Sequence, residues 1–316
     1  MTLDNILEEI KKAESVVILT HENPDGDAIG SVLAMYIALQ RMGKQADMIV
    51  PELPRTFSFL PCADKFLKQG QEEVYDLAIA LDCATIKMLN GFANYFETAK
   101  VKVSIDHHST NTMFGDFNYI NPDSPACAQI LLTILDYFGV EIDKEIGSCL
   151  LTGIITDTGG FQYQNTTPET FEFASDLLKR GVHVSEIYKR VMNTKTKSSF
   201  ELRRRALDRL ELLAQGRIAY TYITKKDEQE VNAEPGDHEG IVEEGRSIEG
   251  VEVSIFLRET EKGFKASLRS NSYVNVSDAC LLFGGGGHIR AAGCMISAPL
   301  EQAKERMISQ IESYLK

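Results

Sequence analysis

The chain has 316 residues, of which 43% are hydrophobic and 25% are charged, and its net charge is −13. This length favours two domains, and the acidic balance argues against a protein that holds long nucleic acids, which use basic surface to release counterions. No apolar run is long enough to span a bilayer, and residues 1–10 lack a signal-peptide pattern. We therefore expect a cytoplasmic protein that does not enter the membrane.

The first half alternates apolar strand-like runs with amphipathic helical stretches. In chain order we predict a helix over 3–10, a strand over 16–19, a helix over 28–42, strands over 46–50 and 77–82, a helix over 89–99, a strand over 101–106 and a helix over 126–138. Such alternation is typical of parallel sheets, whose strands are joined through crossover helices. The fold class predicted here is α/β, with an N-terminal, mostly parallel, doubly wound sheet carrying helices on both faces.

The second half first turns helical and then returns to strands. A helix is predicted to start at Thr167-Pro168 and to end at Gly181, followed by a charged helix over 198–213. Strands over 217–223, 251–259 and 263–270, a helix from Ser277 and a helix over 300–315 complete the pattern. We predict a first domain over 1–190, a linker helix within 191–215, and a smaller α/β domain over 216–316.

Histidines and carboxylates gather where the predicted strands end. The first strand is followed by HENPDGD (residues 21–27), the strand LAIALD ends at Asp82, and VKVSIDHH ends at 106–108. One Asp at a strand end is usually a turn residue or a helix cap, but here three strand ends carry such groups. The carboxyl ends of parallel strands form one crevice where ligands bind. Imidazole and carboxylate together suit divalent cations such as Mn²⁺, so we predict a metal-dependent hydrolase.

The number of candidate ligands favours two metal ions. The candidates are His21, Asp25, Asp27, Asp82, the Asp106-His107-His108 triplet and Asp157. Gly26 permits the tight turn that brings Asp25 and Asp27 toward one point, and Asp82 is placed to bridge. Two-metal sites hold their ions about 3.5–4 Å apart and clamp a hydroxide for in-line attack.

Four segments together resemble a known family. HENPDGDAIGS, LAIALD, SIDHHS and GIITDTG are similar to the four motifs of the DHH phosphoesterase superfamily, and SLRSN with FGGGGHIRAAG resembles its DHH-associated substrate-binding domain. The resemblance covers nearly the whole chain. It implies one ion held by His21, Asp25 and Asp82, and a second held by Asp27, Asp82, His107 and Asp157. It further implies that His108 contacts the scissile phosphate or assists the leaving oxygen, and that Asp106 orients the neighbouring histidine.

The glycine-rich segment near residue 285 has two interpretations. Four glycines followed by His288 can simply form a flexible turn, but successive glycines also let backbone N–H groups converge on an anion. Arg269 offers a bidentate fork for phosphate. Beside a phosphoesterase domain we favour a nucleotide clamp, formed by Arg269, Asn271, Gly286, Gly287 and His288.

Within the superfamily the chain is most similar to the small stand-alone NrnA type. The resemblance implies hydrolysis of short oligoribonucleotides to mononucleotides and conversion of pAp to AMP and phosphate. It also implies two divalent ions, with Mn²⁺ as the preferred metal, and allows a homodimer. Cleavage of cyclic di-AMP or linear pApA stays open as an alternative, because nothing in the sequence separates these substrates. A nucleotide sensor without activity is a hypothesis of another class. We disfavour it because such a protein is expected to lose metal ligands, whereas this chain keeps all the candidates.

Overall fold

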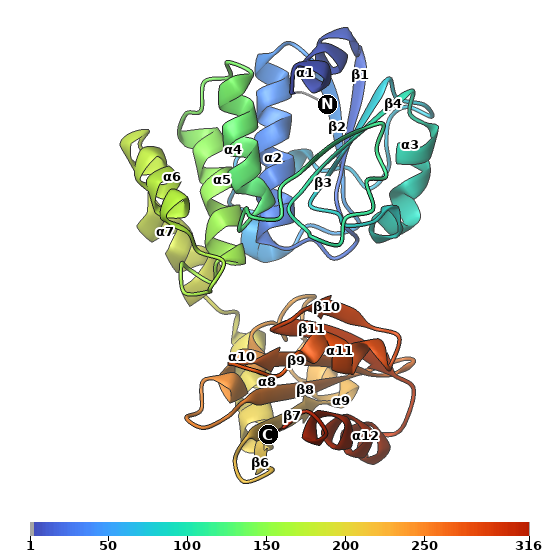
Figure 1. The fold of residues 1–316 in the computed structure, drawn as a ribbon, viewed down its shortest axis with the longest axis vertical. Helices are drawn as coiled ribbons and strands as arrows, with labels where there is room; N and C mark the ends of the chain where they lie inside the picture. Colours follow the sequence, from blue (N-terminus) through green and yellow to red (C-terminus); the bar gives the residue numbers. More distant parts are fainter. Residues whose placement is uncertain (1–2, 316) are drawn as a thin grey trace. The chain divides into compact units, whose positions relative to one another are not determined.

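A computed structural model describes residues 3–315 of the chain (Figure 1). The chain divides into two compact units, Met1–Thr194 and Lys195–Lys316, called unit 1 and unit 2 below. Among the described residues, no helix combines the length and the apolar character that crossing a membrane requires.

Unit 1 is built around five parallel strands, in the order β2-β1-β3-β4-β5. The strands are β1 (Ser15–Leu19), β2 (Gln45–Ile49), β3 (Leu77–Leu81), β4 (Val101–Asp106) and β5 (Phe117–Ile120). The α-helices are α1 (Leu3–Lys12), α2 (Gly26–Arg41), α3 (Ala93–Thr98), α4 (Cys127–Tyr137), α5 (Lys144–Asp157), α6 (Pro168–Lys179) and α7 (Val184–Tyr188). The shorter turns are η1 (Arg55–Phe57), η2 (Ala63–Lys65), η3 (Ile86–Phe92) and the π-helical η4 (Lys189–Asn193).

Side chains of each strand alternate between two cores, so helices cover both faces of this sheet. On β1, Val16 and Ile18 pack into the core formed with α1, α2, α4 and α5, whereas Val17 and Leu19 pack on the opposite side with η3 and α3. This arrangement confirms the predicted doubly wound sheet. The direction of strand addition reverses between β1 and β3, and ligands bind at such a switch point, outside the carboxyl ends of the strands.

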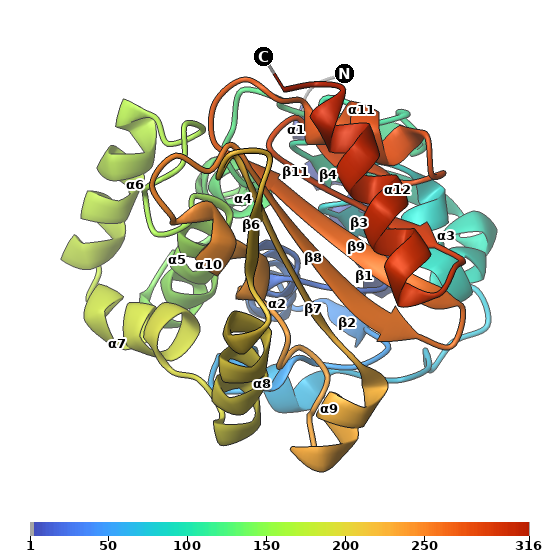
Figure 2. The same cartoon turned by 90° about the horizontal axis from the view of Figure 1, so that it is seen from below.

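Unit 2 holds a six-stranded mixed sheet in the order β10-β11-β9-β8-β7-β6 (Figure 2). Its strands are β6 (Glu211–Leu213), β7 (Ile218–Ile223), β8 (Val253–Thr260), β9 (Gly263–Ser270), β10 (Gly286–His288) and β11 (Ala291–Ile296). Its helices are α8 (Lys197–Asp208), α9 (Lys225–Glu230), α10 (Ile241–Arg246), α11 (Val276–Leu281) and α12 (Leu300–Glu312). Helices α11 and α12 pack on one face, and α8 and α10 pack on the other.

The predicted linker helix corresponds to α8, which belongs to unit 2. Its apolar side chains Leu202 and Ala206 pack against Ile223 and Phe256 of the mixed sheet. The helix ends at Asp208, earlier than the helical pattern predicts, because residues 211–213 pair with β7 as strand β6. Helix α8 is therefore part of the hydrophobic core of unit 2.

Candidate metal centre

The turn between β1 and α2 supplies the first candidate ligands. His21 lies two residues beyond the end of β1, and Asp25 is the N-cap of α2. The Oδ1 atom of Asp25 accepts hydrogen bonds from the backbone N–H groups of Asp27 (3.0 Å) and Ala28 (3.1 Å). An aspartate at an N-cap has one oxygen engaged by the helix and the other directed outward. Asp25 thus combines a local structural role with a carboxylate oxygen at the mouth of the site.

Asp27 is fully buried and is held by a second helix. Its Oδ2 accepts a hydrogen bond from the N–H of Cys127 (2.6 Å), and its Oδ1 accepts one from the N–H of Ala128 (2.8 Å). These are the first two residues of α4, where unpaired N–H groups and the helix dipole favour a negative charge. The contact fixes the position of Asp27 relative to the sheet.

Asp82 lies at the centre of the cluster. It follows β3 with a φ of 57°, a left-handed conformation that, besides glycine, few residues other than aspartate and asparagine adopt readily. Its Oδ2 is 3.7 Å from Nε2 of His21, and its Oδ1 is 3.4 Å from Nε2 of His107. Oδ1 is buried and, within residues 3–315, accepts no hydrogen bond of good geometry. A buried carboxylate oxygen left in this way fits a position that a cation would fill.

His107 is oriented so that one ring nitrogen faces the carboxylates. Its Nδ1 lies 3.2 Å from the backbone carbonyl oxygen of Ser124, to which it donates as the Nδ1–H tautomer. Its Nε2 lies 3.4 Å from Oδ2 of Asp157 and 4.0 Å from Oδ2 of Asp27. An imidazole held by a carbonyl on one side, with its other nitrogen facing carboxylates, is the usual arrangement of a histidine that binds metal.

Asp106 positions the loop that carries both histidines. Its Oδ1 accepts the backbone N–H of His107 (2.8 Å) and lies 2.7 Å from Nδ1 of His108, and its Oδ2 accepts from the side-chain amide of Asn111 (2.7 Å). Nδ1 of His108 is also 3.6 Å from Oδ1 of Asp82. The buried Asp106 thus orients His108, whose ring borders the cluster.

Close packing of two helices brings Asp157 into the group. Asp157 is the last residue of α5, which runs beside α2. A Cβ atom on Gly153 would lie 2.6 Å from both Oδ1 of Asp27 and Cβ of Ala128, and one on Gly30 would meet the carbonyl oxygen of Cys149. The two helices can approach this closely only because glycine has no side chain.

The ionisation of the cluster reflects crowded negative charge. Burial and the charge of Asp82 raise the pKa of Asp27 to about 7, and burial and the charge of Asp27 raise the pKa of Asp157. Burial lowers the pKa of His107, but the neighbouring carboxylates, Asp82 foremost, outweigh it and raise that pKa to about 10. Burial also opposes ionisation of Asp82, yet the imidazoles of His107 and His21 lower its pKa. Without a cation the cluster therefore retains protons, which a bound divalent ion would replace.

Three sets of side chains bring their ligand atoms within 4.8 Å of one another. The sets are His21, Asp25 and Asp82; Asp27, His107 and Asp157; and Asp82, Asp106, His107 and His108. The first set matches one predicted ligand group, and the second matches the other predicted group without its bridging residue. Asp82 lies between them, with one oxygen toward His21 and the other toward His107. The cluster can therefore hold divalent metal ions.

In unit 2 the residues proposed as a nucleotide clamp lie at one end of neighbouring strands. Gly286–His288 forms β10, which pairs with β11, so His288 lies opposite Ala291, and Ala291 lies opposite Arg269 on β9. Directly opposed residues share a face of the sheet. Only the small Ala291 lies between the two basic side chains. Glycine is required at 287, where φ is 145° and a Cβ would meet the backbone of β11.

Two of these residues are engaged by the protein itself. Nε of Arg269 donates to Oε1 of Glu243 (2.7 Å), and its Nη1 donates to the backbone carbonyl oxygen of Leu268 (3.0 Å), so two of its three nitrogens bond to the protein. The side-chain amide of Asn271 donates to the carbonyl oxygens of Arg246 (2.9 Å) and Val251 (2.8 Å). Asn271 therefore braces the loop beside Arg269 in this structure.

Some contributors to the site carry no signal in the sequence. Ser124 acts through its backbone carbonyl, so no side-chain pattern could have revealed it. Asn111 donates to both Asp106 and the carbonyl oxygen of Cys83, and its distance of five residues from Asp106 fits no periodic pattern. Both are partners of the candidate ligands.

Comparison with known proteins identifies the family. Residues 15–154 match the DHH family, N-terminal domain, and residues 215–316 match the DHHA1 domain. The chain is 34% identical over 313 residues to the bifunctional oligoribonuclease and PAP phosphatase NrnA of Thermus thermophilus, covering 98% of this chain and 93% of that protein. The chain belongs to the DHH family. The match to the DHH N-terminal domain ends at residue 154, before Asp157. Asp157 is assigned to the cluster because its carboxylate lies near Asp27 and His107 in the structure.

Two more relatives extend over almost the whole DHH chain. The bifunctional oligoribonuclease and PAP phosphatase NrnA of Bacillus subtilis is 21% identical over 315 residues, covering 98% of both chains. The crystal structure of an exopolyphosphatase-related protein from Bacteroides fragilis has a TM-score of 0.92 and 29% identity, covering 99% of this chain and 96% of that one. The chain thus has the two-domain composition of a family of phosphoesterases.

Proposed function

We propose that this chain is a phosphoesterase that uses two divalent metal ions, most favourably Mn²⁺, to hydrolyse short oligoribonucleotides to mononucleotides and pAp to AMP and phosphate. The observation that carries the proposal is the position of Asp82 between two candidate ligand groups, with one oxygen toward each. The 34% identity with the NrnA protein of Thermus thermophilus over nearly the full length supports the choice of substrates.

The donor set fits the proposed metals. His21, Asp25 and Asp82 would hold one ion, and Asp27, Asp82, His107 and Asp157 would hold the other, a mixture of imidazole and carboxylate that suits Mn²⁺. When bound, such ions would activate water and offset the charge of the phosphate. Within the chain, Asp27 is fixed by the start of α4 and His107 by the carbonyl of Ser124, so both would face the ions without rearrangement.

The remaining candidates take roles in holding substrate and moving protons. His108, oriented by Asp106, borders the cluster and would donate to the scissile phosphate or to the leaving oxygen. In unit 2, Arg269 and His288 share one face of the sheet and would bind a terminal phosphate, with the backbone of Gly286 and Gly287 beside them. Asn271 would contribute by holding the loop next to Arg269.

Initial rates on a panel of substrates would test the proposal. The panel contains pAp, RNA dimers to pentamers, a long RNA and cyclic di-AMP, each with Mn²⁺ and with excess chelator. We expect turnover of pAp and of the shortest RNAs that depends on the metal, and little turnover of the long RNA. Efficient hydrolysis of cyclic di-AMP alone would instead establish the alternative, and no turnover of any substrate would refute the proposal.

A pair of histidine variants makes this test specific. His107→Asn removes a candidate ligand and should lower kcat by about 100-fold, because the Nε2 atom that faces Asp82 and Asp157 is lost. His183→Asn changes an exposed histidine of the same unit and should leave the rate unchanged. Equal rates for the two variants would show that the cluster does not perform the reaction.

A further inference from the structure

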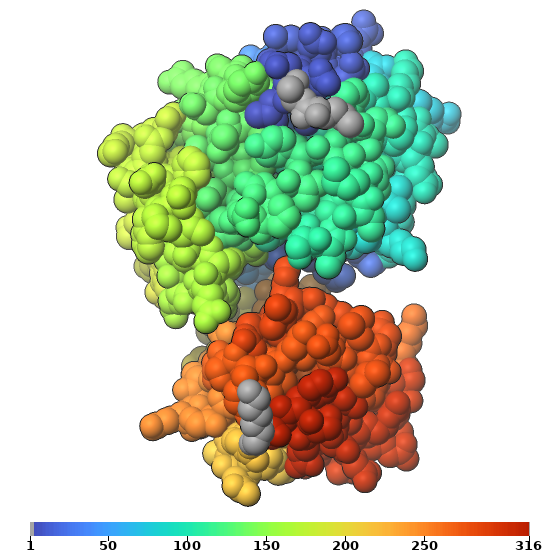
Figure 3. All heavy atoms as spheres, in the orientation of Figure 1, coloured from blue at the N-terminus to red at the C-terminus, as the bar shows by residue number. Residues whose placement is uncertain are grey.

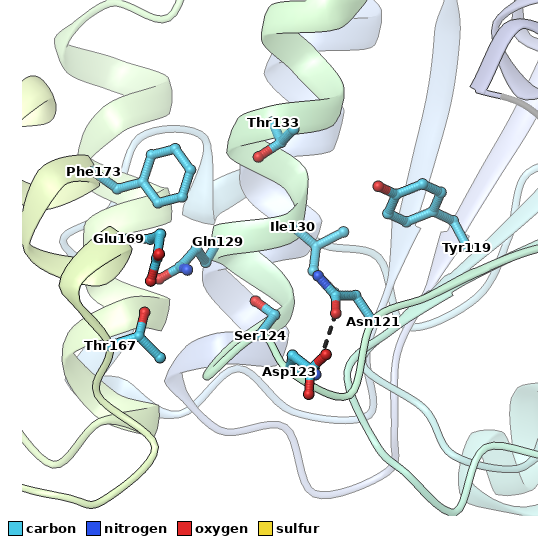
Figure 4. Close-up of a pocket in the computed structure, with 10 residues that line it drawn as sticks. All are labelled: Tyr119, Asn121, Asp123, Ser124, Gln129, Ile130, Thr133, Thr167, Glu169 and Phe173. Atoms are coloured by element: carbon cyan, nitrogen blue, oxygen red, sulfur yellow. Dashed lines mark hydrogen bonds between the residues drawn. The ribbon is translucent and has the colours of Figure 1, made fainter.

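Unit 1 contains a cavity of about 390 Å³ that is separate from the candidate metal ligands. It lies between α4, the start of α6 and the segment that follows β5, and it is lined in part by Tyr119, Gln129 and Phe173 (Figure 4). The face of unit 1 drawn in Figure 3 shows these green and yellow-green segments at the surface. The volume of the cavity falls at the lower end of the range for small-molecule sites.

The charges around this cavity exclude phosphate. Asp123 and Glu169 contribute carboxylates to the lining, and no lysine, arginine or histidine is among the described residues that form it. A phosphate group would be repelled here and would find no cationic partner. The cavity therefore suits a group that carries no negative charge and presents N–H donors, which carboxylate oxygens accept.

The remaining lining combines aromatic rings with side-chain amides. Figure 4 places Phe173 and Tyr119 on opposite sides of the cavity, with Gln129 and Asn121 between them. Gln129 is only 7% exposed, and its Oε1 has no hydrogen-bond partner within residues 3–315. Oε1 is thus a buried acceptor that an N–H group of a ligand would satisfy, and the same amide carries an NH₂ donor. An amide that offers both groups matches the N6 and N7 edge of adenine.

We propose that this cavity is an accessory nucleoside site that takes a base with an exocyclic amino group, adenine above all. The ring of Phe173 or Tyr119 would stack on the base, Gln129 would bind its edge, and Asp123 or Glu169 would accept from its amino group. The choice of a nucleoside as ligand rests on the proposed function, whereas the site itself rests on the lining of the cavity.

The cavity shares one residue with the support of the metal centre. Ser124 lines it, and the carbonyl oxygen of the same residue accepts the hydrogen bond from Nδ1 of His107. A nucleoside in the cavity thus lies against the segment that orients a candidate metal ligand. The cavity and the support of His107 are therefore adjacent through Ser124.

Calorimetric titration of the full chain with adenosine tests the site. The titration is performed with excess chelator, and adenosine carries no phosphate, so the result does not depend on whether the chain hydrolyses any substrate. We expect one adenosine per chain. Binding should weaken about tenfold in Phe173→Ala, which removes a stacking ring, and in Gln129→Met, which keeps the volume but removes the amide.

Two control variants locate the binding. Phe171→Ala changes an exposed phenylalanine of the same helix that does not line the cavity, and His288→Ala changes the candidate clamp in unit 2. Both should bind adenosine as the unmodified chain does. The proposal is overturned if adenosine does not bind, if His288→Ala loses binding while Gln129→Met retains it, or if spermidine binds in its place. Should Phe173→Ala fail to fold, Gln129→Met decides the outcome.

Discussion

Replacing Asp82 by asparagine should abolish stabilisation by metal while leaving the backbone unstrained. Asp82 has a φ of 57°, and asparagine is one of the few residues that tolerate this conformation. Asp82→Asn therefore changes the charge between His21 and His107 and little else. Asp82→Ala removes the same charge and in addition puts a residue that disfavours left-handed backbone at this position.

The expected changes in stability follow from two effects, the loss of metal binding and the cost of left-handed backbone at residue 82. A ligand at 100 times its Kd stabilises the folded state by about 2.7 kcal/mol. For a domain the size of unit 1, this corresponds to a rise in Tm of about 5–11 °C. Asp82→Asn should lose this rise. In chelator, Asp82→Ala should be less stable than Asp82→Asn by about 1–2 kcal/mol, which is the cost of left-handed backbone.

Thermal and urea unfolding of the three proteins, each with Mn²⁺ and with chelator, would measure both effects. Asp136→Asn, an exposed carboxylate on α4, serves as the control and should keep the full rise with Mn²⁺. If Asp82→Asn still gained several degrees from Mn²⁺, Asp82 would not be a ligand. Equal stability of the asparagine and alanine variants in chelator would refute the argument from backbone conformation.

Two further predictions concern packing and charge. Gly153→Ala would place a methyl group 2.6 Å from the carboxylate of Asp27. We therefore expect the free energy of unfolding to fall by about 1–3 kcal/mol and Mn²⁺ binding to weaken. The control Gly91→Ala, where a Cβ meets no atom within 4 Å, should change neither quantity. In unit 2, burial opposes ionisation of Asp227, but the fork of Arg209 (2.6 and 2.8 Å) outweighs it and lowers the pKa of Asp227. The ionised Asp227 should contribute about 1.5–3 kcal/mol to the free energy of unfolding. This contribution should be complete above the unfolded pKa near 4 and should disappear as the pH falls through the folded pKa. Urea unfolding from pH 7 to pH 2 should show the loss, and a pH-independent difference between the unmodified chain and Asp227→Asn would contradict it.

Much of the arrangement in unit 1 could be predicted because it follows from parallel strands. Strands β1, β3 and β4 end beside one another, so groups that follow them in sequence converge in space. This reasoning predicted that His21, Asp82 and His107 would meet without any knowledge of the loops. The strand order itself required the structure, because alternation of strands and helices does not fix which strands are neighbours.

The helix that carries Asp157 could not be recognised in the same way. Residues 144–157 contain Gly147 and Gly153 together with β-branched residues, which all disfavour an isolated helix. The helix α5 is stabilised by packing against α2, and Gly153, which weakens it locally, is also a residue that permits this contact, whereas Gly147 faces Leu177 and Val182. Tertiary packing thus overrides local propensity here, and Asp157 occupies a helix end.

The glycine-rich segment also differs from its simplest interpretation. Gly286–His288 pairs with β11 as a strand, and Gly285 could not carry a side chain without meeting the backbone of Gly293. Local sequence cannot distinguish a flexible turn from an edge strand whose neighbour lies too close for side chains, because both are rich in glycine. The cavity between α4 and α6 is beyond sequence reasoning as well, since its lining comes from separate segments.

The distance along the chain from His21 to Asp157 has a consequence for synthesis. Ribosomes extend a chain at about 5–20 residues per second, so several seconds separate the emergence of the first strand from that of the last carboxylate in the cluster. During this interval the nascent sheet exposes an incomplete group of acids. The set of Asp27, His107 and Asp157 would thus be complete only once residue 157 has been translated, and the ions proposed above would meet all their ligands only from then on.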